Sequence, residues 1–302
     1  MKRFLGLCFT FIFSVQLTAM DNPSAPAYPD IPSYFQDRLA PEFHRVIDHS
    51  RAQRDELAAS QIAILAQQTE MSSFYVEMLS ELRDWEITLL IDDSGSMIGA
   101  RWEEAIRRAK DIAQIACIFD QNGVDLRFLN NTARNRNNVN SVSMVAEALN
   151  FQPSHRTPLN RALEEIYLQL NPEVKNLIVV ITDGEPSDSF LGKVGISGLK
   201  QLVKVNHSTR KGFSKLFRRE IHKNIATSFL LATNDDDVVD LYHSIDGLKG
   251  QIDVLDDYYS ERQEVLKIAG RKRKPVVYTY GDHLARQLLG AIVPQLDGLD
   301  GQ

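Results

Sequence analysis

A carboxylate and two hydroxyl groups recur at every second position in the segment IDDSGSM, which spans residues 91–97. They belong to Asp92, Ser94 and Ser96, and Gly95 between the two serines permits a tight turn. In such a turn alternate side chains can converge on one point. Because the segment follows a hydrophobic run, we expect these oxygen-bearing groups at the end of a buried strand.

Two later segments add one carboxylate and one hydroxyl group. In ITDGEPSD, residues 181–188, Asp183 stands where a second hydrophobic run ends. Earlier in the chain, Thr157 precedes Pro158, a residue favoured at the first position of a helix. Carboxylates and hydroxyls are hard oxygen ligands, and an oxygen-only site with few charges suits Mg²⁺, or Mn²⁺ and Ca²⁺, rather than zinc. The five residues therefore predict a divalent-metal site.

The set resembles the metal-ion-dependent adhesion site of von Willebrand factor type A domains, with the order Asp92-x-Ser94-x-Ser96, then Thr157, then Asp183. The likeness covers roughly residues 85–295, and it is sharp only at the five positions and their strand contexts. It implies that the hydroxyls hold the cation, that the carboxylates act mostly through water, and that an exposed Asp or Glu of a protein partner completes the coordination. On this resemblance Asp183→Ala is expected to lose metal binding without unfolding, because Asp183 is expected at an exposed edge.

The two residues before Thr157 depart from the family pattern. Many members have glycines there, whereas this chain has His155 and Arg156. Two bulky cationic groups at this place could gate the access of a ligand or favour acidic partners. They could equally point to solvent.

The same residues leave enzymatic alternatives open. Asp92-Asp93 after a hydrophobic strand invites comparison with phosphotransferases that use a carboxylate nucleophile and Mg²⁺, but position 94 lacks their second carboxylate. A serine hydrolase with Ser94, His155 and Asp183 would need a G-x-S-x-G turn that the sequence lacks. We therefore expect a binding protein and not an enzyme. The alternatives are a magnesium-dependent phosphotransferase or hydrolase, and an assembly subunit that partners an ATPase.

Strand and helix patterns alternate from residue 85 onward. Short hydrophobic runs predict strands at 85–91, 124–129, 176–182, 226–233 and 251–255, and 276–280 (VVYTY) is also strand-like. Helical spacing predicts helices at 102–119, 141–149, 158–170 and 282–296, an acidic helix after 233, and a polar loop at 130–138. This alternation predicts an α/β fold, Rossmann-like, with a mostly parallel central sheet and helices on both faces. Ligands bind at the carboxyl ends of the strands in such sheets.

The N-terminal residues indicate export. Lys2 and Arg3 precede a charge-free run, which predicts a secretory signal or, alternatively, an uncleaved N-terminal anchor. We expect a secreted or periplasmic protein, and a cytoplasmic one if the leader is not functional. The predicted divisions are 1–20 leader, 21–40 proline-rich linker, 41–84 helical segment and 85–296 type A-like domain, with a basic insert at 189–225.

The composition narrows the classes of function. With 43% hydrophobic and 25% charged residues the chain is globular, and its net charge of −6 argues against a nucleic-acid binder. The basic insert is followed by an acidic stretch at 235–264, which either neutralises it within the fold or leaves it free for an anionic partner. Membrane contact is expected only through the N-terminal segment or the basic insert. The helical segment at 41–84 is expected to contain two helices that pack on their own domain or recruit a partner.

Overall fold

The computed structural model describes residues 51–120, 122–171, 173–206, 224–233, 235–246, 251–271, 277–293 and 296. The predicted leader and linker, the start of the helical segment and residues 207–223 of the basic insert therefore lie outside the described residues. Within the described ranges, no helix combines the length and the apolar character that crossing a membrane requires.

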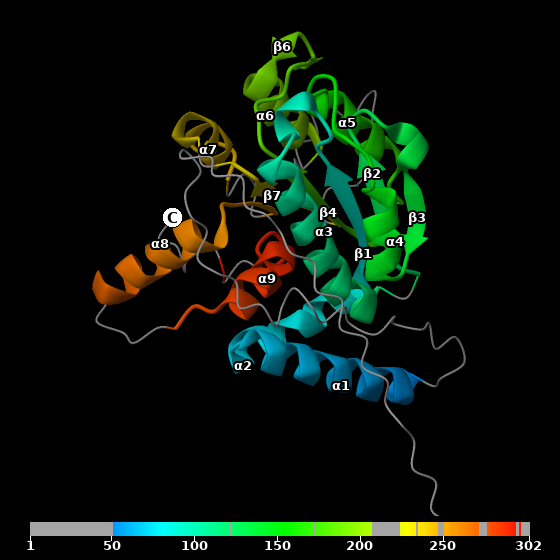
Figure 1. Cartoon of the computed structure of the whole chain (residues 1–302), viewed down its shortest axis with the longest axis vertical. Helices are drawn as coiled ribbons and strands as arrows, with labels where there is room; N and C mark the ends of the chain where they lie inside the picture. Colours follow the sequence, from blue (N-terminus) through cyan, green and yellow to red (C-terminus); the bar gives the residue numbers. More distant parts are fainter. Residues whose placement is uncertain are drawn as a thin grey trace, which may run out of the picture. The chain divides into compact units, whose positions relative to one another are not determined.

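A six-stranded sheet forms the centre of the fold (Figure 1). Its strands are β1 (Trp85–Ile91), β2 (Val124–Phe128), β3 (Arg136–Val139), β4 (Lys175–Thr182), β7 (Ile225–Leu231) and β8 (Ile252–Leu255). Their order is β3-β2-β1-β4-β7-β8, and every neighbouring pair is parallel except β2 and β3. The predicted α/β fold with a mostly parallel sheet is therefore confirmed.

Helices cover both faces of the sheet, as predicted. They are α1 (Arg51–Thr69), α2 (Ser73–Met78), α3 (Ala100–Phe119), α4 (Val142–Ala148), α5 (Leu159–Gln169), α6 (Gly195–Asn206), α7 (Asp236–His243), α8 (Tyr258–Arg271) and α9 (Tyr280–Leu289). The short 3₁₀ helices are η2 (Leu79–Asp84), η3 (Gly95–Met97) and η4 (Thr132–Arg134). A separate two-stranded sheet is formed by β5 (Ser189–Phe190) and β6 (Lys193–Val194).

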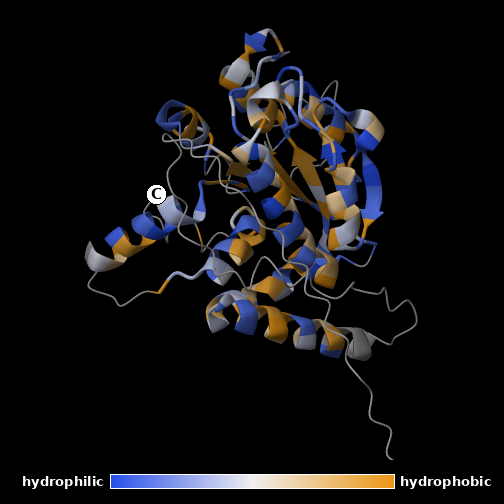
Figure 2. Cartoon of the chain, viewed as in Figure 1, coloured by the Kyte–Doolittle hydropathy of each residue, from blue (hydrophilic) through white to orange (hydrophobic). Residues whose placement is uncertain are grey.

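Two hydrophobic cores fill the spaces between the sheet and the helices. Successive residues of a strand point to opposite faces, so Leu89 belongs to the core beneath α1, α3 and α9, whereas Leu90 belongs to the core beneath α5, α6 and α7. Figure 2 shows hydrophobic strands at the centre of the sheet and hydrophilic residues on the edge strand β3. Ile62 of α1 and Tyr75 of α2 are part of the first core, so the described part of the helical segment packs on its own domain.

Several elements differ from the expectations. β3 lies in the segment predicted as a polar loop, because an edge strand with exposed side chains carries no hydrophobic alternation. Helix α8 was not predicted. The strand-like VVYTY is not a strand where it is described: residues 277–279 have no regular structure and Tyr280 begins α9. A reciprocal capping box between Thr279 and Asp282 starts α9 there, and it outweighs the strand propensity of the β-branched residues. The last helix also ends earlier than predicted, at Leu289.

Helix α9 is buried along nearly its whole length. Every residue from Gly281 to Leu289 is buried, including the polar ones. Its leucines pack in the first core with the strands, and the Arg286 guanidinium binds Glu261 of α8 at 2.8 Å. The helix is thus a central part of the core and not a covering element.

Asp120 at the end of α3 gives the domain a pH-dependent stability. Its carboxylate accepts a hydrogen bond from the Ile87 amide at 3.2 Å, and burial raises the pKa of Asp120 to about 7 despite this bond. An unfolded aspartate titrates near 3.9. Between these values the folded state keeps a proton that the unfolded state loses, so the free energy of unfolding falls as the pH rises from about 4 to 7.

We expect Asp120→Asn to remove much of this slope, which is at most about 1.4 kcal/mol per pH unit. The amide keeps an acceptor for Ile87 and does not ionise, so the variant should match the wild type at pH 4 and exceed it at pH 8. Urea unfolding across this range measures the difference. Asp84→Asn, at an exposed side chain, is the control. A variant that keeps the whole slope of the wild type would contradict the assignment.

Candidate metal centre

The two predicted carboxylates follow neighbouring strands at the same edge of the sheet. Asp92 comes directly after β1 and Asp183 directly after β4, and Ile91 pairs with Ile181 at the ends of these strands. The Asp92 amide donates a hydrogen bond to the Ile181 carbonyl at 2.8 Å. The chain leaves β1 toward β2 on one side and returns to β4 on the other. This is the topological switch point at which doubly wound sheets bind ligands.

The turn after β1 joins the serines to both carboxylates. The Ser94 amide donates to Asp92 Oδ1 at 2.9 Å, and the single turn η3 brings Ser94 Oγ within 3.0 Å of Ser96 Oγ. Ser96 Oγ in turn donates to Asp183 Oδ1 at 2.9 Å. Four of the five predicted residues therefore form one connected group, in which Ser96 is exposed and the other three are buried.

Thr157 is held beside this group by backbone contacts. The Gly95 amide donates to the His155 carbonyl at 3.0 Å, and the Ser187 amide donates to the Thr157 carbonyl at 2.8 Å. The segment is thereby tied to both loops that carry the other ligands, and Thr157 itself is buried. No hydrogen bond joins its hydroxyl to the other four side chains, all of which the structure describes.

The spacing of the oxygens fits a small divalent cation. Neighbouring oxygens of an octahedron with metal–oxygen bonds of ~2.1 Å lie about 3 Å apart. The steps from Ser94 Oγ to Ser96 Oγ and on to Asp183 Oδ1 are 3.0 and 2.9 Å. Within the described ranges, no cluster of three or more His, Cys, Asp or Glu side chains is placed to hold a metal. The predicted set contains only two such residues, because its other three donors are hydroxyls.

Burial makes the ionised form of Asp92 unfavourable when no positive charge lies beside it. It raises the pKa of Asp92 to about 6, and the nearby Asp183 adds to the rise. Hydrogen bonds from Thr182 and Ser94 work in the opposite direction. A cation between the two carboxylates would favour their ionised forms.

Asp183 does not occupy the exposed position that the sequence suggested. It is buried, and its two carboxylate oxygens are engaged separately: Oδ1 accepts from Ser96, and Oδ2 binds the guanidinium of Arg101 at 2.7 Å. The expectation that its removal affects metal binding alone therefore rested on a wrong premise. A change at this position also alters an ion pair.

His155 and Arg156 are both exposed beside the site. His155 has a positive φ of 75°, which few non-glycine residues adopt, and its carbonyl accepts the hydrogen bond from Gly95. The Arg156 carbonyl accepts from Asn130 Nδ2 at 2.9 Å. Their backbones thus shape the site, while the role of their side chains as gates stays a prediction.

Three residues of the site were not predicted. Thr182 donates its hydroxyl to Asp92 Oδ2 at 2.7 Å, and Arg101 binds Asp183. Asn130 donates backbone and side-chain hydrogens to Asp93 Oδ1. A signal existed only for Thr182, the polar last residue of a hydrophobic strand. The direction of Arg101 depends on where α3 begins after Gly99, which the sequence pattern does not fix.

A pocket of about 320 Å³ adjoins the site between β2 and α5. It begins at Asn130 and Pro158, next to the metal-site loops, and extends along α5 as far as Gln169. Its lining is more polar than apolar, and Arg127, Arg161 and Glu165 are among the lining residues.

Comparison of the chain with protein-family models gives no match, and comparison with curated proteins gives none at a significant level. The resemblance to von Willebrand factor type A domains therefore rests on the five residues and on their places in the fold.

Proposed function

We propose that this protein binds an acidic side chain of a partner protein through a divalent cation, Mg²⁺ or else Mn²⁺ or Ca²⁺. The cation would be held by Asp92, Ser94, Ser96, Thr157 and Asp183. The observation that carries the proposal is the connected row of Ser94, Ser96 and Asp183 oxygens, spaced like neighbours in an octahedron at the switch point of the sheet.

The residues divide the work between holding the cation and orienting the ligands. The three hydroxyls are neutral donors, so the only negative charges come from Asp92 and Asp183. Thr182 and the Ser94 amide fix the two oxygens of Asp92, and Ser96 fixes one oxygen of Asp183. The bound cation supplies an electrophilic centre with residual positive charge. An incoming carboxylate would be the natural additional ligand.

The surroundings of the site support a protein partner with acidic groups. Arg101, His155 and Arg156 all lie at the same edge, and His155 and Arg156 are exposed. The adjoining pocket offers space and two further cationic groups, Arg127 and Arg161, to residues that flank the acidic one. These features favour binding over the enzymatic alternatives, since the carboxylate of Asp93, beside Asp92 in the chain, already accepts hydrogen bonds from the loop after β2. Membership of the type A family and export to a secreted or periplasmic location are part of the same proposal.

A thermal melt with and without metal tests the proposal. A cation at ~100 times its dissociation constant adds ~2.7 kcal/mol to the stability, which for a domain of this size is about 5–10 °C in the melting temperature. We expect such a rise with millimolar Mg²⁺, Mn²⁺ or Ca²⁺ over EDTA, and we expect Thr157→Ala to lose it.

Thr132→Ala is the matched control, because this exposed threonine lies at the same edge outside the proposed ligand set. The control should keep the full rise. If no cation shifts the melting temperature of the wild type, or if Thr157→Ala responds as the wild type does, the proposed site is wrong.

A further inference from the structure

We propose that Arg101 is a built-in counter-cation of the candidate metal centre. In this view it competes with the divalent cation for Asp183, and after displacement it binds the second oxygen of the partner's carboxylate. The inference rests on the proposed function and adds a specificity-determining residue to it.

Arg101 and Asp183 form a direct ion pair in which only the arginine is exposed. Arg101 Nη1 lies 2.7 Å from Asp183 Oδ2, and the Arg101 side chain is 44% exposed whereas the Asp183 side chain is 0% exposed. The same nitrogen lies 3.4 Å from the Ser96 carbonyl. One positive group therefore covers the solvent side of a buried carboxylate whose other oxygen belongs to the proposed ligand row.

The position of Arg101 in its helix points to a role outside the helix. It is the second residue of α3, after Gly99, which has a φ of 88°. A positive charge in the first turn of a helix faces the positive end of the helix dipole and is locally unfavourable. The ion pair with Asp183 offsets this unfavourable interaction. Arg101 therefore stabilises the carboxylate that follows β4 and does not stabilise α3.

A divalent cation beside Asp183 would weaken this ion pair. The guanidinium and the cation would both be drawn to one carboxylate and would repel each other at short range. Because Arg101 is nearly half exposed, its guanidinium can be hydrated on release, and the divalent cation replaces it as the counter-charge of the buried Asp183. A buried arginine such as Arg108, which is 1% exposed, could not move in this way.

A displaced Arg101 would remain beside the open coordination position. Its planar guanidinium offers paired N–H donors that match the two oxygens of a carboxylate. A partner carboxylate could then place one oxygen on the cation and the other on Arg101. Neutral ligands such as amides and alcohols would gain less from this arrangement, so Arg101 selects for Asp or Glu.

The test measures Mn²⁺ binding to the full chain by calorimetry, first alone and then with acetate as the carboxylate probe. Without acetate, Arg101→Gln should bind Mn²⁺ about three- to tenfold more tightly than the wild type, since the competitor is gone. Acetate should strengthen Mn²⁺ binding by the wild type and do so much less in Arg101→Gln. Arg101→Lys should keep the competition and lose most of the acetate effect, because an ammonium lacks the planar pair of donors.

Arg262→Gln is the matched control, since Arg262 is an exposed arginine of α8 that belongs neither to the proposed site nor to the lining of the adjoining pocket. It should behave as the wild type in both titrations. If the wild type binds Mn²⁺ and Arg101→Gln binds it equally or less tightly, the counter-cation is refuted while the metal site stands. If neither binds Mn²⁺, the metal site itself is refuted and this inference with it. Binding by Arg101→Gln alone would support both.

Discussion

Replacing Glu104 by glutamine should lower the free energy of unfolding by about 3–5 kcal/mol, because it leaves a buried arginine without its charged partner. Glu104 Oε1 accepts from Arg108 Nε at 2.7 Å and from Arg107 Nη2 at 2.5 Å. Burial alone would raise the pKa of Glu104, but Arg108 and Arg107 outweigh burial and lower the pKa to about 2. The carboxylate is therefore ionised near neutral pH.

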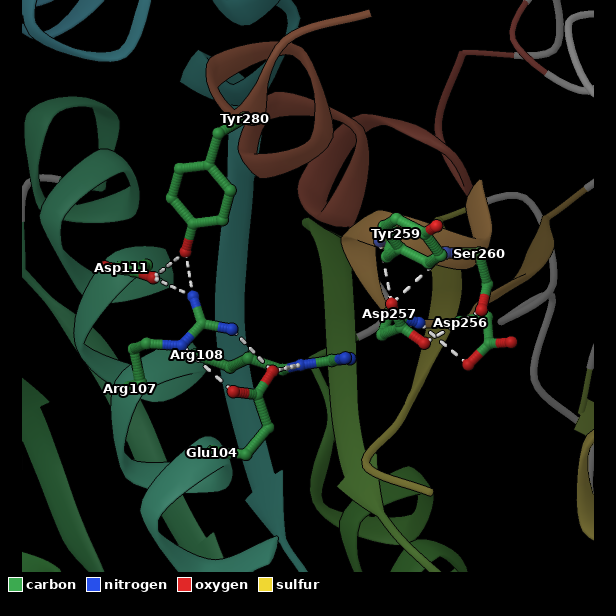
Figure 3. A network of polar contacts seen from close by, with 9 residues as sticks. All are labelled: Glu104, Arg107, Arg108, Asp111, Asp256, Asp257, Tyr259, Ser260 and Tyr280. Atoms are coloured by element: carbon green, nitrogen blue, oxygen red, sulfur yellow. Dashed lines mark hydrogen bonds and ion pairs between the residues drawn. The ribbon is translucent and has the colours of Figure 1, made fainter. Parts of the chain in front are cut away.

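The network around Glu104 explains the size of the effect. Figure 3 shows Glu104 between Arg107 and Arg108, with Tyr280 of α9 reaching Arg107 and Asp111. The Tyr280 hydroxyl donates to Asp111 Oδ2 at 2.6 Å, and the Arg107 Nη1 lies 3.2 Å from the same oxygen. The network thus joins α3 to the buried helix α9, and its loss would loosen the first core.

An exposed pair of the same kind supplies the control. Arg161 and Glu165 are also spaced i,i+4 and lie 2.8 Å apart, but their side chains are 77% and 52% exposed. Glu165→Gln should cost less than about 0.5 kcal/mol. Urea unfolding of both variants gives the comparison, and the double variant Glu104→Gln/Arg108→Met should recover part of the loss. Equal effects at Glu104 and Glu165 would refute the argument from burial.

Changing Asp183 to asparagine should weaken Mg²⁺ binding by at least about 10- to 100-fold, which is the loss typical even of a partner that only orients a metal ligand. Asparagine keeps the size and an acceptor for Ser96, but it removes one of the two negative charges of the set. Calorimetric titration with Mg²⁺ measures the loss.

The same variant should keep its fold. In EDTA its free energy of unfolding should lie within about 1 kcal/mol of the wild type, since it breaks only the partly exposed pair with Arg101. Asp188→Asn is a control on the same loop. The Asp188 carboxylate accepts hydrogen bonds from the Asn160 and Arg161 amides at the start of α5, and it is not part of the ligand row. Wild-type affinity for Mg²⁺ in Asp183→Asn would refute the role of this carboxylate.

The elements that could be predicted are those whose burial requires a regular pattern of hydrophobic residues in the sequence. β1, β4 and β7 are hydrophobic because both of their faces lie under helices, and α3 repeats apolar residues at helical spacing. β3 left no such pattern because its side chains Arg136, Asn137 and Asn138 are exposed. α9 was misplaced at its start because a hydrogen-bonded cap, and not hydrophobicity, decides where it begins.

The candidate site also contains residues that could be predicted from the sequence and one that could not. Asp92, Ser94, Ser96 and Asp183 could be predicted to meet, because strand ends of a parallel sheet share an edge and the spacing of the serines is local. Arg101 could not, since its contact with Asp183 joins residues 82 positions apart and depends on the direction of a helix. Long-range pairs between an exposed and a buried charge have no local sequence signal.

The burial of α9 also sets the order in which the domain can be completed. Its leucines belong to the same core as Leu89 of β1, although nearly two hundred residues separate them in the chain. Chains are synthesised from the N-terminus at about 5–20 residues per second, so the strands emerge from the ribosome many seconds before the helix that covers them. The part of this face that α9 covers therefore stays open to other apolar surfaces until α9 has been made. During that interval a holdase chaperone has an apolar surface to bind, and the mature fold closes only after residue 289 has been made.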